Sequence, residues 1–236
     1  MSKKYQISKS SYLRGIQCLK SVYLYKYYSR YRDPLPESRK IRFEKGHDIG
    51  KLARKIFPGG VDVSPPHSGL YPASATKTAS LMASKETIIY EPAFIYNEVL
   101  AALDIIVYND GWFAYEVKSS EKISATYLED AALQFFVITG CGIKLKDFSI
   151  IHLKKNYLEI NFNDETDEIF QITSVFEQCK GRQEQITRKI DEIKYILASP
   201  SVPLIKRGDH CHQPYECDFI GWCTKQEEEI KDGLFQ

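Results

Sequence analysis

Two segments decide the fold: AALDIIV at residues 101–107 and WFAYEVKSS at residues 112–120. Both are apolar and rich in residues that favour strands, and Asn109-Asp110-Gly111 between them is typical of a hairpin turn. The two segments are therefore predicted to form adjacent buried strands. Because side chains alternate along a strand, Glu116 and Lys118 should share one face of the sheet, with Val117 on the other.

An acidic residue interrupts the first of these strands. Asp104 lies among aliphatic side chains, where an unpaired carboxylate is strongly disfavoured, so a compensating cation is expected. With Glu116 and Lys118 it would place two acids and one lysine at the end of a central sheet, as a divalent-metal phosphodiesterase requires. The alternative is a buried structural Asp beside a surface ion pair, because structural ion pairs also surround buried acids.

The composition is that of an ordinary globular protein. The 236 residues are 43% hydrophobic and 27% charged, which suits one domain with an appendage. The formal net charge of +1 conceals an asymmetry, because residues 1–60 contain 15 Lys or Arg but only 4 Asp or Glu. Such an excess favours a basic face for a polyanion, or else a solvated cationic helix.

Several functional classes are disfavoured by what the sequence lacks. No secretory signal follows Met1 and no apolar run approaches the roughly 18 residues of a membrane span, so a cytoplasmic protein with no membrane partner is predicted. In a reducing compartment the six cysteines are expected to be ligands or buried thiols rather than disulfides. No Gly-rich phosphate loop of the Walker type is present, so ATP hydrolysis is not expected.

The N-terminal segment is predicted to be a helix from Ser8 to about Tyr28, with Cys18 inside it. Tyrosines alternate here with Lys and Arg, and aromatic rings beside cations are a means of holding single-stranded nucleic acid. Tyr23 and Lys26 are candidates for that role. The alternative is that the tyrosines pack this helix against the rest of the protein.

A second helix is predicted from Ile41 to Phe57. His47, Lys51 and Arg54 fall at i, i+4 and i+7 and form one polar stripe on it. His47 is a candidate metal ligand, although a lone histidine is often structural. Lys51 and Arg54 are candidate contacts for nucleic acid.

Further elements follow on either side of the central hairpin. Strands are predicted at 87–91 and 93–96, with a bulge or edge position at Pro92, and at 148–153 and 157–160. Glu91 is an acid in an apolar strand and a weaker metal-ligand candidate. A helix from Ser124 to about Thr139 places Asp130 and Gln134 at i and i+4; Gln134 is either a group that orders an attacking water or a surface amide.

The C-terminal part contains three evenly spaced cysteines, Cys211, Cys217 and Cys223. Thiolates on one ion or cluster would stabilise a segment too short to bury a core. A fourth ligand is needed, and Cys18 would bring the N-terminal helix to this segment. Zinc with the three cysteines and His210 or His212 is the competing assignment, and an iron–sulfur cluster is equally compatible.

Together these residues resemble the PD-(D/E)XK nuclease superfamily, in particular RecB-like exonucleases with an iron–sulfur cluster, such as CRISPR-associated RecB-like exonucleases and AddB-type nuclease domains. The resemblance rests on KGHDIGKLAR at 45–54, Leu103-Asp104, EVKSS at 116–120, the Gln134 helix and the four cysteines, and runs from about Ser8 to Cys223. The chain is also similar to a bacterial group with Ser-Lys-Ser and Phe-Pro-Gly-Gly signatures, here at 8–10 and 57–60.

Two features depart from the family pattern. The cysteines lack the Cys-x-x-Cys pair of the best-known relatives, which puts the type of cluster in doubt. The aromatic residue expected after Gln134 is represented by Phe135 and Phe136, which puts a tyrosine contact in doubt.

The resemblance implies an α/β fold with a restriction-endonuclease-like mixed central sheet flanked by helices. It implies a single nuclease domain over residues 1–236, with its core at about 41–198. A small cysteine-ligated cluster subdomain, from about 8–32 plus 205–225, would join the N- and C-termini.

The resemblance also implies a deoxyribonuclease, an exonuclease, that depends on Mg²⁺ or Mn²⁺ and carries a [4Fe-4S] cluster. Its substrate would be DNA that is single-stranded or has free ends, and its partner a helicase, CRISPR or repair protein. Asp104, Glu116 and the Val117 carbonyl would hold the metal, with His47 and Glu91 as further ligands. Lys118 would orient the attacking water and Gln134 would position it. The alternative is a catalytically silent single-stranded DNA-binding module or helicase partner of the same fold, with Zn²⁺ in the cysteine site.

Overall fold

The computed structural model describes residues 5–34, 36–161 and 163–231. The protein is a mixed α/β protein with two mixed sheets flanked by helices. None of the six cysteines, all within the described residues, forms a disulfide. No helix in these ranges is long and apolar enough to cross a membrane.

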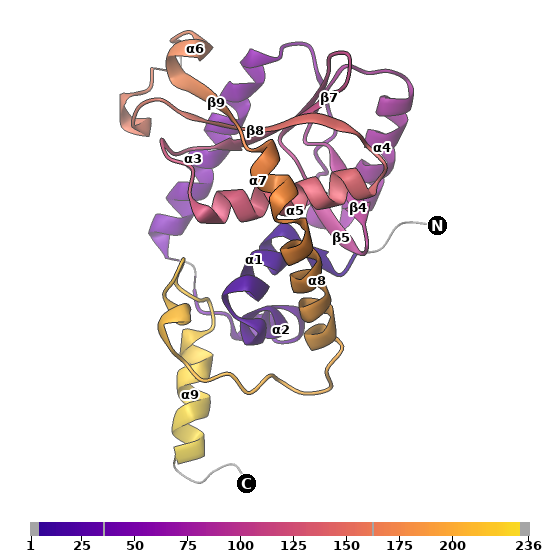
Figure 1. Cartoon of the computed structure of the whole chain (residues 1–236). Helices are drawn as coiled ribbons and strands as arrows, with labels where there is room; N and C mark the ends of the chain where they lie inside the picture. Colours follow the sequence, from indigo (N-terminus) through magenta and orange to yellow (C-terminus); the bar gives the residue numbers. More distant parts are fainter. Residues whose placement is uncertain (1–4, 35, 162, 232–236) are drawn as a thin grey trace. The chain divides into compact units, whose positions relative to one another are not determined.

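The chain divides into two compact units, which we describe separately (Figure 1). Unit 1 comprises Met1–Lys9 and Ile41–Ile186, and unit 2 comprises Ser10–Lys40 and Thr187–Gln236. Unit 1 contains both sheets, and unit 2 is built from helices and loops at the two ends of the sequence.

The larger sheet of unit 1 has six strands in the order β2-β3-β6-β7-β8-β9. Their bounds are Val61–Asp62, Ile88–Tyr90, Ile105–Tyr108, Trp112–Lys118, Leu145–Leu153 and Phe170–Ser174. The predicted hairpin is confirmed, because β6 and β7 pair antiparallel and Asp110 and Gly111 take positive φ in the turn. β9 was not predicted.

The strand predicted at 157–160 is wrong. Tyr157–Glu159 forms a single 3-10 turn instead. The side chain of Asn156 accepts a hydrogen bond from the Leu158 N–H at 3.0 Å, and such a local bond gives the backbone an alternative to a sheet ladder.

The smaller sheet has the order β1-β5-β4, with bounds Ile7–Ser8, Val99–Ala102 and Ala93–Tyr96. The chain leaves the larger sheet at Glu91-Pro92 and returns to it at Leu103-Asp104. These two crossing points pair: the Glu91 N–H donates to the Asp104 carbonyl (2.8 Å) and the Leu103 N–H to the Pro92 carbonyl (3.0 Å).

A single strand over 101–107 is therefore wrong. Asp104 lies in a bend between β5 and β6, which belong to different sheets. Pro92 on the partner strand has no N–H to continue a ladder, so the sheet ends there. The bend takes the Asp104 carboxylate out of the aliphatic surroundings that a continuous strand would have given it.

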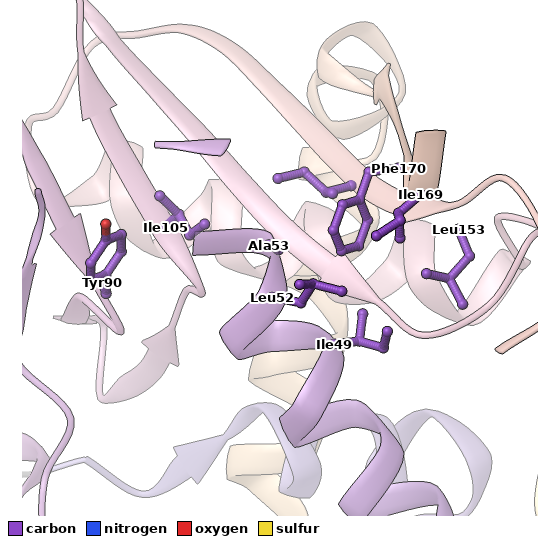
Figure 2. Close-up of a cluster of buried hydrophobic side chains, with 9 residues drawn as sticks. Ile49, Leu52, Ala53, Tyr90, Ile105, Leu153, Ile169 and Phe170 are labelled. Carbon is purple, nitrogen blue, oxygen red and sulfur yellow. The ribbon is translucent and has the colours of Figure 1, made fainter. Parts of the chain in front are cut away.

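Helices cover both faces of the larger sheet. From α3 (Glu37–Ala53), Ile49 and Leu52 pack with Ile105, Ile151 and other apolar residues in one buried cluster (Figure 2). Val117 packs against the same cluster. On the other face lies α5 (Ala125–Gly140), which contacts β8 and also β4 and β5 of the smaller sheet. Ser124 caps its N-terminus, because the Ser124 hydroxyl accepts the Tyr127 N–H.

The remaining helices of unit 1 are shorter. α4 (Tyr71–Ala83) packs on β4, α6 (Thr166–Ile169) leads into β9, and α7 (Phe176–Gly181) packs on α5. With Val117 directed to the α3 side of the sheet, alternation directs Glu116 and Lys118 to the α5 side. The site is therefore built between the larger sheet and α5.

Unit 2 draws its helices from both ends of the chain. They are α1 (Lys9–Gln17), α2 (Leu19–Tyr27), α8 (Gln183–Leu197) and α9 (Ile220–Lys231), of which α1 and α8 begin in unit 1. The helix predicted from Ser8 to Tyr28 is wrong, because Cys18 has extended dihedral angles (φ −162°, ψ 118°) and separates α1 from α2. Its N–H still closes α1 on the Arg14 carbonyl, and its own carbonyl accepts the first bond of α2.

Two close contacts hold the helices of unit 2. Gly15 of α1 faces Ile193 of α8, and a Cβ at Gly15 would lie 2.4 Å from Ile193 Cδ1. Asp218 is buried and accepts from Arg14 Nη2 at 2.5 Å and Arg32 Nη2 at 2.9 Å. The carboxylate of Asp218 thus ties the C-terminal segment to α1 and to the segment that follows α2.

Candidate active site

Three of the predicted site residues, Glu116, Lys118 and Gln134, come together with Asp130 on the α5 side of the larger sheet. Lys118 Nζ donates to Glu116 Oε1 (2.6 Å) and to Asp130 Oδ2 (2.6 Å). Gln134 Nε2 donates to Glu116 Oε2 (2.9 Å) and to Asp130 Oδ1 (3.1 Å). Glu116, Asp130 and Gln134 are buried. One turn of α5 therefore presents an acid and an amide to the two charged residues of β7.

Asp104 reaches the same place from the bend between β5 and β6. Its Oδ2 accepts the Val117 N–H at 2.6 Å. Val117 stands between Glu116 and Lys118, so this bond fixes the Asp104 carboxylate beside both of them. The bend that removes Asp104 from a strand is thus what allows its side chain to meet β7.

Lys9 completes the cluster. Its Nζ lies 2.8 Å from Glu116 Oε1 and 3.3 Å from Asp130 Oδ2. Lys9 directly follows β1, and β1 runs parallel to β5, the strand that precedes Asp104. Because the carboxyl ends of neighbouring parallel strands meet at one edge of a sheet, Lys9 and Asp104 are delivered to the same edge.

Burial and mutual contact shift the acids in opposite directions. Burial, and then the neighbouring Glu116, raise the pKa of Asp104 well above its ordinary value. Burial would also raise the pKa of Glu116, but Lys118 and Lys9 more than offset it, so the pKa of Glu116 is lowered. Glu116 is therefore the carboxylate that stays ionised, and Asp104 is the one that gains most from an added cation.

The lysines are held charged by the same contacts. Burial acts to lower the pKa of Lys118, but Asp130 and Glu116 outweigh it and the pKa is raised. The pKa of Lys9 is raised in the same way. Neither lysine is therefore suited to accept a proton at neutral pH, and both act as cations and donors.

We expect Asp104→Asn to stabilise the metal-free protein, increasingly so as pH rises from about 5 to 8. A raised folded-state pKa means that wild type keeps full stability only below the unfolded pKa of about 3.9 and loses it as pH rises through the folded pKa. Asn cannot ionise, so Tm in EDTA should exceed that of wild type by a few degrees at pH 8 and by less at pH 5.

The matched control for this change is Asp110→Asn. Asp110 is exposed and its pKa is lowered by its hydrogen bond with Lys146, so this change should bring no gain that grows with pH. Equal Tm gains for Asp104→Asn at pH 5 and pH 8 would contradict the assigned shift.

The donor set suits one hard divalent cation. Asp104 and Glu116 offer carboxylate oxygens and Val117 a backbone carbonyl, the ligand types that Mg²⁺ and Mn²⁺ prefer. Burial and the neighbouring Glu116 raise the pKa of Asp104, so a bound cation would favour its ionised form. Gln134 Oε1 is buried and has no hydrogen-bond partner among the described residues, so one acceptor remains available for a water.

Two predicted ligands are not brought to this donor set. No three His, Cys, Asp or Glu side chains in the described part of the chain are arranged to hold one metal ion. His47 is exposed on α3, whose packed side chains face the Val117 side of the sheet. Glu91 is next to Asp104 along the backbone pairing, but its carboxylate accepts from Arg54 Nη2 at 3.2 Å.

The predicted nucleic-acid contacts differ in their surroundings. Lys26 and Lys51 are exposed, as the prediction requires. Arg54 is engaged by Asp62 at 2.6 Å and by Glu91. Tyr23 contradicts the prediction, because it is 5% exposed. Its ring packs against Tyr27 and Tyr28, with centroids 4.8 and 6.4 Å away, which leaves no free face for a base.

Unit 2 contains a cavity lined by four cysteines, Cys18, Cys211, Cys217 and Cys223. These are the four that were predicted to bind a cluster. The other two, Cys141 and Cys179, lie in unit 1. His210 lines the cavity and its Nε2 is 3.7 Å from Cys211 Sγ, whereas His212 is exposed and pairs with Glu216.

Burial favours the protonated thiol at two of these four cysteines. Burial raises the pKa of Cys18, and burial raises that of Cys223 to about 11. Lys20, Lys206 and Arg207 also line the cavity and would offset the negative charge of bound thiolates. The cavity therefore joins soft ligands with compensating cations.

The two metal assignments need different arrangements of the sulfurs. Zinc requires every sulfur within about 2.3 Å of a single ion, whereas an iron–sulfur cluster binds each cysteine through a different iron and accepts sulfurs that are farther apart. Among the described residues, no three His, Cys, Asp or Glu side chains are arranged to hold one metal ion.

Two residues of the site were missed by sequence reasoning, Lys9 and Asp130. Asp130 carried a usable signal, because it lies one turn before Gln134 on the same side of a helix. The only sequence signal at Lys9 was the Ser-Lys-Ser triplet at 8–10. That triplet does not indicate a contact with Glu116, which lies 107 positions away in the sequence.

No protein-family model and no curated protein matches the chain.

Proposed function

We propose that the protein is a metal-dependent deoxyribonuclease of the PD-(D/E)XK type, related to RecB-like exonucleases. The observation that carries this proposal is the convergence of Asp104, Glu116 and Lys118 at one edge of the larger sheet. Two unlike carboxylates and a charged lysine are the groups needed to bind a hard cation and to act on a phosphodiester. The order of these residues along two strands and a following helix supports the same family.

Asp104, Glu116 and the Val117 carbonyl would hold Mg²⁺ or Mn²⁺. The bound ion would supply a water of lowered pKa and stabilise charge on the phosphoryl group. Lys118 stays protonated between Glu116 and Asp130, so it would orient that water and offset negative charge in the transition state. The side-chain amide of Gln134 donates to Glu116 and Asp130. Its Oε1 would accept a hydrogen bond from the water.

Asp130 would act as a positioning residue in this scheme. It is not one of the proposed metal ligands. Its Oδ2 accepts a hydrogen bond from Lys118 Nζ at 2.6 Å, and its Oδ1 accepts one from Gln134 Nε2 at 3.1 Å. The cavity of Cys18, Cys211, Cys217 and Cys223 would bind a [4Fe-4S] cluster. The cluster would have a structural role, because it would stabilise unit 2, which is built from helices and loops.

The proposal is tested with end-labelled single- and double-stranded DNA. Protein purified without oxygen should shorten a labelled strand in Mg²⁺ or Mn²⁺ and leave it intact in EDTA. Binding of DNA without any metal-dependent product would instead support a silent binding module of the same fold. Iron and sulfide analysis with the visible absorbance of the same preparation separates a cluster from zinc.

A further inference from the structure

Two ammonium groups compete for one pair of carboxylate oxygens in the candidate active site. Lys118 Nζ contacts Glu116 Oε1 and Asp130 Oδ2, and Lys9 Nζ contacts the same two atoms. Each of the two lysines therefore bridges the Glu116 and Asp130 carboxylates. The family pattern accounts for Lys118 and leaves Lys9 without a role.

The two lysines are not equally held. Lys118 lies 2.6 Å from both oxygens and its side chain is 14% exposed. Lys9 lies 2.8 and 3.3 Å from them and is 35% exposed. Lys9 is therefore the cation that leaves more readily and at lower desolvation cost.

The oxygen of Glu116 that holds both lysines has no room for a further cation. Its Oε1 accepts both lysines and its Oε2 accepts Gln134 Nε2. A carboxylate oxygen has about two acceptor positions, so an ion that binds Oε1 must replace one of the ammonium groups.

The charge of the site leads to the same conclusion. Asp104, Glu116 and Asp130 carry three negative charges when ionised, and the two lysines leave one of them uncompensated. One divalent ion together with Lys118 alone makes the site neutral. The ion together with both lysines would leave an excess positive charge in a partly buried place, which is unfavourable.

We propose that Lys9 is the counter-ion of the metal-free site and is displaced from Glu116 when a divalent cation binds. This inference rests on the proposed metal-dependent function. The ammonium keeps Glu116 paired while the ion is absent. The ion then takes its place beside Lys118, which stays paired with Glu116 and Asp130.

The test is Mn²⁺ binding by titration calorimetry to wild type, Lys9→Met and Lys146→Met, without DNA. Met keeps the apolar stem of Lys9 but not its charge. We expect the Mn²⁺ Kd to fall at least about tenfold in Lys9→Met, because a direct competitor for the same oxygen is removed. Its Tm in EDTA should fall, and the Tm gain on adding Mn²⁺ should exceed that of wild type. Lys146, which pairs with Asp110 at the surface, should change none of these values.

A second measurement uses wild type and so does not depend on the folding of a variant. Acetic anhydride labelling read by mass spectrometry should modify Lys9 several-fold faster in Mn²⁺ than in EDTA, with Lys146 unchanged. The proposed displacement of Lys9 by the metal ion would be overturned if Lys9→Met had unchanged or weaker Mn²⁺ affinity. It would also be overturned if the rate of Lys9 labelling were the same with and without Mn²⁺. Mn²⁺ binding with these effects but no DNA cleavage would leave the displacement standing and overturn the nuclease. No Mn²⁺ binding at all would overturn both.

Discussion

Lys118→Met should reduce metal-dependent DNA cleavage by about 10³-fold or more, while Mn²⁺ still binds. Lys118 is the better held of the two site cations, and it offers the charge and the donor that a developing phosphoryl charge needs. The loss of one such group typically costs about 10²–10³ in rate, and the orientation of the water is lost with it. The measurement is the initial rate on end-labelled DNA at saturating Mn²⁺, with Mn²⁺ binding followed separately.

Lys146→Met is the matched control for that loss. Lys146 lies on β8 in the same sheet, but it pairs with the exposed Asp110 at 2.8 Å, and exposed pairs contribute little. Its cleavage rate should match wild type. A Lys118→Met protein that binds Mn²⁺ and retains more than a tenth of the wild-type rate would rule out this lysine as a catalytic group.

Asp218→Ala should destabilise unit 2 by about 3–5 kcal/mol, the usual result of removing one partner of a buried ion pair. Its carboxylate is 3% exposed and neutralises both Arg14 and Arg32, which are 19% and 29% exposed. Without it the two guanidinium groups, both packed over the ring of Tyr25, face one another uncompensated. A fall in Tm of about 2–4 °C per kcal/mol is expected.

The two tryptophans allow this loss to be assigned to a unit. Trp112 lies in unit 1 and Trp222 in unit 2, so in a Trp112→Phe background the fluorescence of Trp222 follows unit 2 alone. The control is Asp191→Ala, an exposed acid on α8 in the same unit, which should shift the transition by less than about 0.5 kcal/mol. Equal transitions for the two variants would show that Asp218 does not hold the unit together.

Local signals explain which parts of the fold could be predicted. The turn at 109–111 has the chemistry that a tight hairpin demands, and the alternation of β7 assigns Glu116 and Val117 to opposite faces. The switch of sheets at Asp104 could not be predicted this way, because apolar residues stand on both sides of Asp104, at the end of β5 and the start of β6. Only the pairing of Leu103 with Pro92, a contact across the hairpin, ends one strand and begins the next.

The residues of the candidate site also differ in whether local sequence signals could predict them. Asp104, Glu116, Lys118 and Gln134 stand within a short stretch, and their spacing on strands and a helix predicted their neighbourhood. Lys9 reaches them through the parallel pairing of β1 with β5, which involves two residues and leaves no periodic pattern. Tyr23 was misjudged for the opposite reason, because an alternation of tyrosines and cations is the same whether the rings face solvent or one another.

The discontinuous make-up of unit 2 sets an order for its assembly during synthesis. Unit 1 contains no residue beyond Ile186, so it can fold before residues 187–236 have been synthesised. Residues 10–40 can complete unit 2 only when that later segment has been made. Cys18 meets Cys211, Cys217 and Cys223 only after residues 211–223 have been made. Closing so long a loop is entropically costly, so the two segments that line the four-cysteine cavity come together late in synthesis.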